Sequence, residues 1–299
     1  MSVNAESFKT VSRGRPGHSP ASVARALGVS ESSLKRWCDA GHLSFARTAG
    51  GHRRVRTAAV LAFAKSHGHR VIAPEELGLV PLDGTPNEPT LRSRFMRLLI
   101  AGQSRGVTEL LSALFASGTS VADLCDGFIA PTLADLGEAW AGGGLEIYEE
   151  RRACELIGRA LADLADLAPH LGKRAPRAIG GTITGDPYTL PTLMAEATLR
   201  HQGVDARSLG ASLPAPTIVA AIREIKPKIV WLTVGHVLDE DAFIADVSHI
   251  EAAAAGVGAA LAIGGRALGS RLRLELRCAV FCDGMQQLAS FGRALASQR

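Results

Sequence analysis

The chain has 299 residues, of which 46% are hydrophobic and 21% are charged. This length provides two or three ordinary domains with hydrophobic cores, and the composition excludes a mostly disordered chain. No apolar run reaches the roughly 18 residues that a membrane helix needs, and residues 1–20 lack the apolar stretch of a secretory signal. The five cysteines are scattered, so no disulfide framework is expected. We therefore expect a soluble, cytoplasmic protein without a membrane partner.

Positive charge is concentrated in the first 70 residues. They carry twelve basic and three acidic side chains, a net charge of +9, which leaves −5 for the remainder of a chain whose total is +4. A basic head on a mildly acidic body indicates a module that binds a polyanion, joined to another unit. A solvated basic surface would give the same charge count.

Helix and turn signals predict a winged helix-turn-helix over residues 1–70. Two short helices are expected to begin after Ser19 and Ser30, whose hydroxyls are candidate N-caps. A Gly50-Gly51 pair marks a hairpin tip between two short strands, and a third helix is expected from about Thr57. Two helices around a tight turn, followed by a hairpin, are typical of DNA-binding domains.

The rest of the chain divides into three parts by its periodicity. Residues 71–89 contain four prolines and two glycines and are predicted to be a linker. Residues 90–175 show apolar residues at helical spacing in four segments, the pattern of a four-helix bundle. Between residues 176 and 299, five strand-like runs alternate with helical stretches, which indicates a doubly wound parallel α/β domain of Rossmann-like type. The predicted fold class is therefore multi-domain, α and α/β.

The head resembles the DNA-binding domain of MerR-type transcription factors. The resemblance covers roughly residues 19–65 and rests on ASVARALGVSESSLKRWCDAGHL followed by RTAGGHRRVRTAAVLAF. It implies that double-stranded DNA is the partner, with the second helix facing base edges and the hairpin, or wing, contacting phosphates. The candidate DNA-binding residues are Ser32, Ser33, Lys35, Arg36, Arg47, His52, Arg53, Arg54 and Arg56. Trp37 is interpreted as a core residue.

The order of head, bundle and α/β domain resembles the CarH/LitR group of light-responsive repressors, whose last two domains hold a cobalamin. The positions equivalent to that group's pocket are Trp140, Glu150, Arg151, Asp186, Tyr188, Pro191, Thr233, Gly264 and Gly265. Two of the group's motifs depart from their pattern in this chain. Arg151 replaces the His of a Trp-x9-Glu-His motif, while Tyr188 and Pro191 replace the cobalt-ligating His and the Gly of an Asp-x-His-x-x-Gly motif.

The three replacements argue against cobalamin binding. A neutral phenol is a poorer cobalt ligand than an imidazole, proline adds bulk where glycine allows close approach, and arginine brings a permanent charge. We expect a transcriptional regulator, of repressor type, that keeps the sensory architecture and works without a cofactor or metal. A sensor for haem or another tetrapyrrole is the alternative, since tyrosine can ligate haem and arginine can pair with a propionate.

An enzyme is a third possibility, which the sequence disfavours. A corrinoid mutase or methyl-transfer module would need the same His and a catalytic domain, and no nucleophile elbow, P-loop or zinc motif occurs. The pair Cys278 and Cys282 is interpreted as strand packing. Because MerR-type heads bind half-sites, a homo-oligomer is expected. The resemblance also suggests an accessory protein or a photoreceptor as a partner that supplies the switch.

Overall fold

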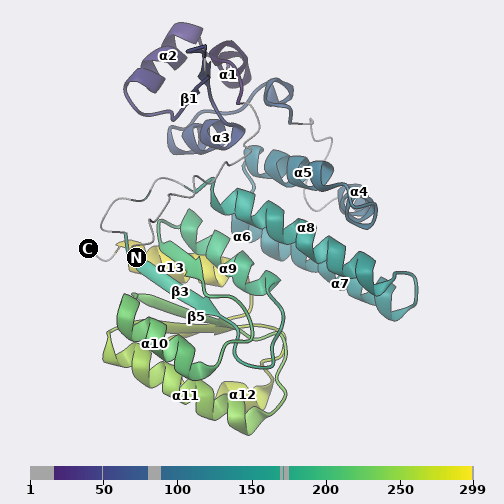
Figure 1. The fold of residues 1–299 in the computed structure, drawn as a ribbon, viewed down its shortest axis with the longest axis vertical. Coiled ribbons are helices and arrows are strands. Elements are labelled where there is room, and N and C mark those ends of the chain that lie inside the picture. The colour runs from purple at the N-terminus through teal and green to yellow at the C-terminus, as the bar shows by residue number, and fades with distance from the viewer. Residues whose placement is uncertain (1–16, 49, 80–88, 169–170, 172–174, 298–299) are drawn as a thin grey trace, which may run out of the picture.

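The computed structural model describes residues 17–48, 50–79, 89–168, 171 and 175–297. Figure 1 shows a small helical head, a layer of long helices beneath it, and a sheet flanked by helices, arranged along the long axis of the molecule. This arrangement agrees with the predicted multi-domain α and α/β fold class. None of the helices in the described part of the chain has the length and hydropathy that a membrane span requires.

The head contains the predicted pair of helices and the hairpin. Its elements are α1 (Pro20–Leu27), α2 (Glu31–Asp39), β1 (Ala46–Arg47), β2 (Arg53–Arg54) and α3 (Thr57–Ser66). The hydroxyls of Ser19 and Ser30 accept hydrogen bonds from the backbone N–H groups of Ser22 and Ser33, which confirms both predicted N-caps. Strands β1 and β2 pair antiparallel on either side of the glycine pair. The second helix and the hairpin therefore lie where a helix-turn-helix places its DNA-facing elements.

The first part of the predicted linker belongs to the head. Residues 74–77 form a short 3₁₀ helix, η1 (Pro74–Leu77), that packs on α1. Glu76 forms an ion pair with Arg25 at 2.6 Å, and the N–H of Ile72 donates to the carbonyl of Ala26 at 2.8 Å. The side chain of Leu77 is buried and adds an apolar contact, which the proline and glycine content of this segment does not indicate. The other predicted linker positions, 80–88, lie outside the described residues.

The helical layer contains the four predicted segments. Its elements are α4 (Pro89–Ile100), α5 (Ser104–Ala116), α6 (Val121–Leu124), η2 (Cys125–Ile129), α7 (Ala130–Ala141) and α8 (Ile147–Ala165). One of the four segments is a continuous helical run, α6–η2–α7, with a π-helical turn at η2. The rings of Phe95 and Phe128 meet in the core with centroids 4.9 Å apart. A π turn changes the direction of the side chains around it and is frequent at functional sites.

The sheet domain has five parallel strands in the order β4-β3-β5-β6-β7. The strands are β3 (Arg177–Gly181), β4 (Asp205–Ser208), β5 (Ile229–Thr233), β6 (Ala260–Gly264) and β7 (Val280–Cys282). The helices are α9 (Leu190–His201), α10 (Ala215–Ile225), α11 (Glu240–Gly256), α12 (Ser270–Glu275) and α13 (Met285–Ser297). The strand order reverses between β3 and β5, which is the point where doubly wound sheets bind ligands.

The helical layer packs directly on one face of the sheet domain. Helices α9 and α13 cover the face toward the layer, whereas α10 and α11 cover the opposite face (Figure 1). Helix α8 contacts α9, and His201 on α9 is 2.7 Å from the carbonyl oxygen of Leu164 on α8. We call the contact between the helical layer and the α9 and α13 face the seam.

Candidate functional site

The predicted DNA-contacting residues of α2 lie near its N-terminus and on its exposed side. The hydroxyl of Ser30 is 2.9 Å from the hydroxyls of both Ser32 and Ser33, so the three serines form one capping cluster. Lys35 forms an ion pair of 2.8 Å with the helix residue four positions earlier, and Arg36 is exposed. The side chains of α2 that are exposed enough to contact a partner are therefore those of Ser32, Lys35 and Arg36.

Arg53 has a different position from the other predicted wing residues. Its Nη2 donates to Oδ1 of Asp39 at 2.6 Å, and its Nη1 donates to the carbonyl of Lys35 at 3.3 Å. Its guanidinium also lies 4.9 Å from the centroid of the Phe45 ring. Only 19% of the side chain is exposed. Arg53 therefore fastens β2 to the C-terminal half of α2, a structural role that sequence reasoning did not predict.

The remaining wing residues are more accessible. Arg47, His52 and Arg56 are exposed, and Nη1 of Arg47 donates to a carbonyl at the hairpin tip at 3.1 Å. Arg54 is half-buried near His18. Burial, with a smaller effect of the Arg54 charge, lowers the pKa of His18. The exposed cations follow the hairpin that projects beside α2, an arrangement suited to a polyanion.

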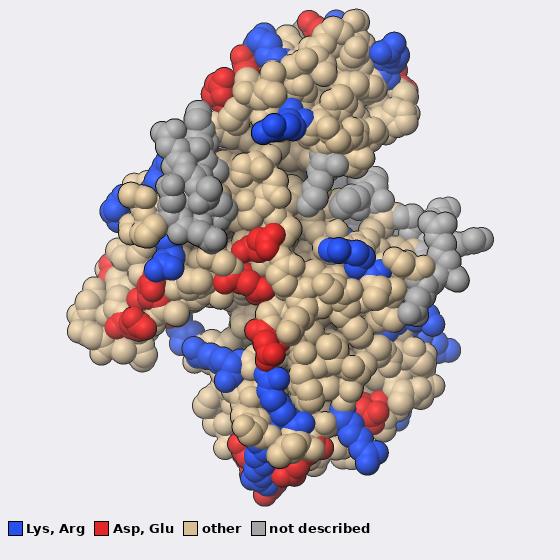
Figure 2. Space-filling view, turned by 180° about the vertical axis from the view of Figure 1, so that it is seen from behind, with Lys and Arg blue, Asp and Glu red and all other residues tan. Residues whose placement is uncertain are grey.

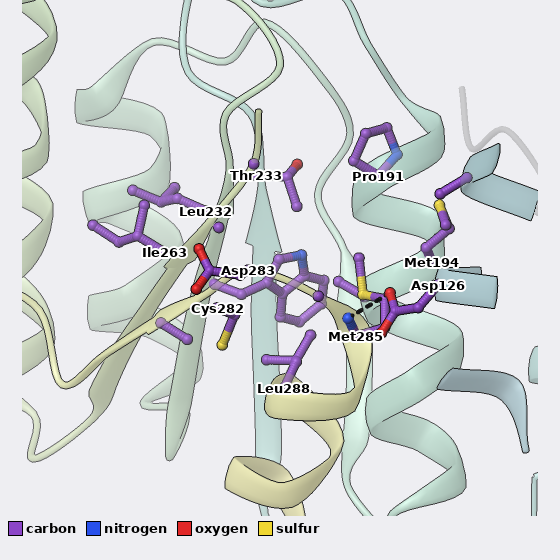
Figure 3. Close-up of a pocket in the computed structure, with 17 residues that line it drawn as sticks. Asp126, Pro191, Met194, Leu232, Thr233, Ile263, Cys282, Asp283, Met285 and Leu288 are labelled. Atoms are coloured by element: carbon purple, nitrogen blue, oxygen red, sulfur yellow. Dashed lines mark hydrogen bonds between the residues drawn. The ribbon is translucent and has the colours of Figure 1, made fainter. Parts of the chain in front are cut away.

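A cavity of about 190 Å³ lies at the seam, and four predicted pocket positions line it. They are Pro191 at the start of α9 and, at the strand ends, Thr233, Gly264 and Gly265. Figure 3 shows the side chains of β5, β6, α9 and α13 converging on this cavity, with Asp126 entering from the helical layer. The lining residues that sequence reasoning missed are Asp126, Ala130, Met194, Ala195, Trp231, Leu232, Ala262, Ile263, Cys282, Asp283, Gly284, Met285 and Leu288. We call this space the seam cavity.

The wall of the seam cavity is mostly apolar, with Thr233, Asp126 and Asp283 as its polar side chains. Trp231 is buried, and its indole Nε1 donates to the hydroxyl of Thr192 at 3.0 Å. Burial, with smaller effects of neighbouring Cys278 and Asp283, raises the pKa of Cys282 to about 11, so its thiol is neutral. Among the described residues, the buried hydroxyl of Thr233 has no hydrogen-bond partner. An unsatisfied buried polar atom is uncommon in proteins and calls for a physical explanation.

The two glycines of the cavity are explained by close backbone packing. A Cβ on Gly264 would lie 2.5 Å from the carbonyl oxygen of Cys282. A Cβ on Gly265 would lie 2.2 Å from that of Val234, and Gly265 has a φ of +136°. Both positions therefore require glycine for the strand ends to pack, whether or not a ligand approaches them.

Asp186 and Tyr188 lie in the loop after β3 and do not line the seam cavity. The buried carboxylate of Asp186 accepts hydrogen bonds from the N–H groups of Gly235 at 2.6 Å, His236 at 3.3 Å and Tyr188 at 3.1 Å. Asp186 thus ties the loops after β3 and β5 together. Tyr188 is 41% exposed, and the guanidinium of Arg266 lies 5.2 Å from its ring centroid.

The three predicted positions on the bundle also lie outside the seam cavity. Trp140 at the end of α7 is 49% exposed, and Arg151 on α8 is exposed with its Nε 3.5 Å from Oε2 of Glu150. Cys154 donates from its sulfur to Oε1 of Glu150 at 3.2 Å. Burial and this carboxylate raise the pKa of Cys154 to about 12. Figure 2 shows an opening between this end of the helical layer and the sheet domain.

Comparison with known proteins gives two matches to family models. Residues 19–68 match a helix-turn-helix domain, and residues 91–164 match a B12 binding domain. The first match covers the head and the second covers most of the helical layer. The comparisons therefore assign separate domain types to the two parts of the chain that precede the sheet.

Two repressors of Myxococcus xanthus and one corrinoid protein are similar to this chain. The HTH-type transcriptional repressor CarH is 26% identical over 151 residues, which are 50% of each chain, and CarA is 27% identical over 225 residues, 71% of this chain and 74% of CarA. The chain thus spans about half the length of the first of these relatives. The monomethylamine corrinoid protein of Methanosarcina barkeri shares the fold with a TM-score of 0.57 and 12% identity, over 69% of this chain and 98% of its own. The chain is therefore similar to the repressors CarH and CarA, and it joins a part that matches a helix-turn-helix domain to a part that matches a B12 binding domain.

Proposed function

We propose that this protein is a DNA-binding transcriptional regulator of repressor type, not an enzyme, and that its body acts without cobalamin. The observation that carries the DNA-binding part is the wing beside α2, held there by the contact between Arg53 and Asp39. This contact keeps the exposed cations Lys35 and Arg36 of α2 next to those of the hairpin. A rigid, basic helix-and-wing surface fits a major groove and its flanking phosphates. Similarity to CarH and CarA supports the same function.

Selection of duplexes from a random pool by the full chain tests this function. Arg36→Ala should change which bases are selected, because an exposed arginine on α2 can reach base edges. Arg56→Ala on the wing should weaken binding to all duplexes and lower the slope of log K against log salt by about 0.9, as expected for one phosphate contact. Arg207→Ala, an exposed arginine on β4, is the matched control and should change neither property. Selection of no sequence, or equal effects of all three variants, would contradict the proposal.

The proposal that cobalamin is not used rests on how the candidate ligand residues are placed. Tyr188 is partly exposed beside Arg266, and the Asp186 carboxylate is occupied by three backbone N–H groups. The seam cavity, about 190 Å³, is smaller than the roughly 300–1,000 Å³ of pockets for drug-sized ligands. This placement supports the proposal that the protein does not bind a corrinoid.

Spectral titration with adenosylcobalamin, with haem as a second arm, tests the cofactor proposal. We expect no change in the cobalamin spectrum and no effect of light on DNA binding. The triple variant Arg151→His, Tyr188→His, Pro191→Gly should recover some cobalamin binding if the replacements alone prevent it. A cobalt–nitrogen signature in the unmodified protein would contradict the proposal. A tetrapyrrole that binds tightly and is lost in Tyr188→Phe would favour the tetrapyrrole sensor instead.

We also propose that the protein works as a homo-oligomer, because helix-turn-helix heads read paired half-sites. Exposed Ile147 and Tyr148 at the start of α8, together with Trp140, offer apolar surface for self-association or for an accessory protein or photoreceptor. Light scattering on the full chain at micromolar concentration should give a mass above that of the monomer. A monomer at these concentrations, with and without DNA, would contradict this part of the proposal.

A further inference from the structure

We propose that Arg13 and Arg15, in the segment that precedes α1, enter the minor groove beside the bases that α2 reads and select A·T pairs there. This role rests on the proposed DNA-binding function and deepens it, because it adds a second, sequence-dependent contact outside the major groove. We call residues 12–16 the arm. The arm lies outside the described residues, whereas its attachment to the head, at Gly17 and His18, is described.

The arm is attached at the base of the wing. His18 and Val55 form an antiparallel bridge, in which the N–H of His18 donates to the Val55 carbonyl at 2.7 Å and the N–H of Val55 donates to the His18 carbonyl at 3.0 Å. Nε2 of His18 is 2.7 Å from the hydroxyl of Thr57 at the start of α3. A Cβ on Gly17 would lie 2.7 Å from the Val55 carbonyl oxygen, so glycine lets the chain pass flat against this strand.

This attachment places the start of the arm next to a candidate DNA contact. In an antiparallel pair, the residue before His18 stands opposite the residue after Val55, which is Arg56. Arg56 is exposed and is one of the wing cations to which we assign a phosphate contact. A duplex held by α2 and the wing therefore passes close to the point where the arm begins.

The residue pattern of the arm suits a groove of DNA. The arm reads Ser-Arg-Gly-Arg-Pro, and no acidic residue occurs between Glu6 and Glu31. In an extended chain, residues two positions apart face the same side, so both arginines would point into one groove. The glycine between them has no side chain to hold the backbone away from the groove floor, and Pro16 restricts the residue before it to extended conformations. The pattern therefore fits a short chain that lies along a groove and directs two cations into it.

The chemistry of the minor groove accounts for the preference for A·T pairs. The groove is about 6 Å wide in B-DNA, and A-tracts narrow it and strengthen its negative potential, which attracts arginine. An A·T pair presents only acceptors there, whereas a G·C pair adds the N2 amino donor of guanine. A guanidinium has five donors and no acceptor, so it bonds to the floor of an A·T pair and meets a competing donor at a G·C pair. Arginines in arms beside other helix-turn-helix domains enter the minor groove in this way.

The length of the arm sets which base pairs it can read. An extended residue spans at most about 3.3–3.6 Å, so Arg13 can lie up to about 17 Å from His18. Half a helical turn of B-DNA is also about 17 Å, which is the separation along the axis between a major-groove site and the next minor-groove site. We therefore expect the A·T preference within about five base pairs of the bases that α2 contacts.

The test uses the full chain and duplexes that carry the sequence selected with it from a random pool. The flank of about five base pairs is all A·T, all G·C or all I·C, since inosine lacks the N2 amino group and keeps the major-groove acceptors of guanine. In anisotropy titrations the A·T flank should be bound about 5- to 30-fold more tightly than the G·C flank, as for one or two weakened base contacts. The I·C flank should restore most of this affinity.

Three variants separate groove readout from charge. Arg13→Ala combined with Arg15→Ala should abolish the difference between the A·T and G·C flanks. Gly14→Val keeps both charges and holds the backbone away from the floor, so it should lower the A·T preference by about 3- to 10-fold, as for one lost hydrogen bond, and leave the salt dependence on the G·C flank unchanged. Arg207→Ala combined with Arg223→Ala, both exposed on the sheet domain, is the matched control and should keep the full preference.

Three results would overturn the role of the arm. They are equal binding of the A·T and G·C flanks by the unmodified chain, equal losses on both flanks in the double arm variant, and an I·C flank bound as weakly as the G·C flank. The second result would indicate phosphate contacts alone, and the third would exclude readout of the groove floor. If the unmodified chain still selects a sequence that Arg36→Ala alters, these results refute only the arm. If the unmodified chain selects no duplex, the regulator itself is refuted.

Discussion

Arg53→Ala should weaken DNA binding through the geometry of the head and not through a lost phosphate contact. In the structure this arginine is the main polar link between the wing and α2, with Asp39 as its partner at 2.6 Å. Arg54 follows it on the same strand and points elsewhere, near His18. Of these two neighbouring arginines, Arg53 therefore has a structural role, and Arg54 is the candidate for a phosphate contact.

The contacts set the magnitude of the effect on stability. Side-chain exposures of 19% for Arg53 and 61% for Asp39 make this a partly screened ion pair, with a coupling of about 0.5–1 kcal/mol. Loss of the stack on Phe45 and of the bond to the Lys35 carbonyl adds about 1 kcal/mol. The free energy that holds the wing against α2 should fall by about 1–2 kcal/mol, which corresponds to roughly 5- to 30-fold faster local opening.

Two measurements on the full chain distinguish a structural role of Arg53 from a phosphate contact. Hydrogen exchange of the β1–β2 amides should accelerate in Arg53→Ala, and a double-mutant cycle with Asp39→Ala should recover the coupling. The slope of log K for DNA against log salt should stay nearly constant in Arg53→Ala and fall by about 0.9 in Arg54→Ala. A full one-phosphate change of slope in Arg53→Ala, with unchanged hydrogen exchange, would refute the structural role.

Three further predictions concern other parts of the fold. Asp126→Ala should speed hydrogen exchange in the first turn of α13 by about 5- to 30-fold, because an N-cap contributes about 1–2 kcal/mol, and Asp126→Asn should have a smaller effect. Gly265→Ala should lower the free energy of unfolding of the sheet domain by about 3 kcal/mol or more in chemical denaturation, since its Cβ would lie 2.2 Å from the Val234 carbonyl. The stability of the head should be greatest above pH 6.5 and decrease as the pH falls below this value, because the pKa of His18 is lowered in the folded state and protonation favours unfolding. His18→Gln should remove this pH dependence in thermal denaturation.

Local signals explain why much of the fold follows from the sequence. The caps at Ser19 and Ser30 and the Gly50-Gly51 tip depend on residues within four positions of each other, so they can be recognised without knowing the tertiary structure. The five strands are short apolar runs between helical stretches, and the parallel order follows from their alternation with helices. Helix α12 cannot be recognised in this way, because its six residues, two of them arginines, carry no clear helical period.

Long-range contacts explain what the sequence does not reveal. Residues 71–79 have the proline and glycine content of a linker, yet Glu76 reaches Arg25, a partner 51 positions earlier. Arg53 belongs to a run of basic residues, and only the position of Asp39 distinguishes it from its neighbours. In both cases the structural role depends on a partner that is distant in the sequence, and neither charge nor composition indicates that partner.

Only some residues of the candidate pocket were predicted, because others reach it from distant parts of the sequence. Thr233, Gly264 and Gly265 were named from the resemblance to the CarH/LitR group, and the structure brings them to one cavity because parallel strand ends meet at one edge of the sheet. Asp126 was missed because its carboxylate caps α13, a helix that begins 159 positions later in the chain. An acidic residue within the otherwise apolar stretch LCDGFI was the available signal, since a charge at such a position needs a partner.

The side chain of Trp231 explains why the seam cavity is small. It lies on the central strand β5, and a Cβ at the facing position of β3, Gly180, would lie 2.2 Å from its ring. The absence of a side chain at Gly180 lets the indole lie across the sheet and reach the Thr192 hydroxyl on α9. The indole thus occupies space between the sheet and α9 that a smaller residue would leave open. The fold is shared with a corrinoid protein, and in this chain the side chain at position 231 limits the space left open on this face of the sheet.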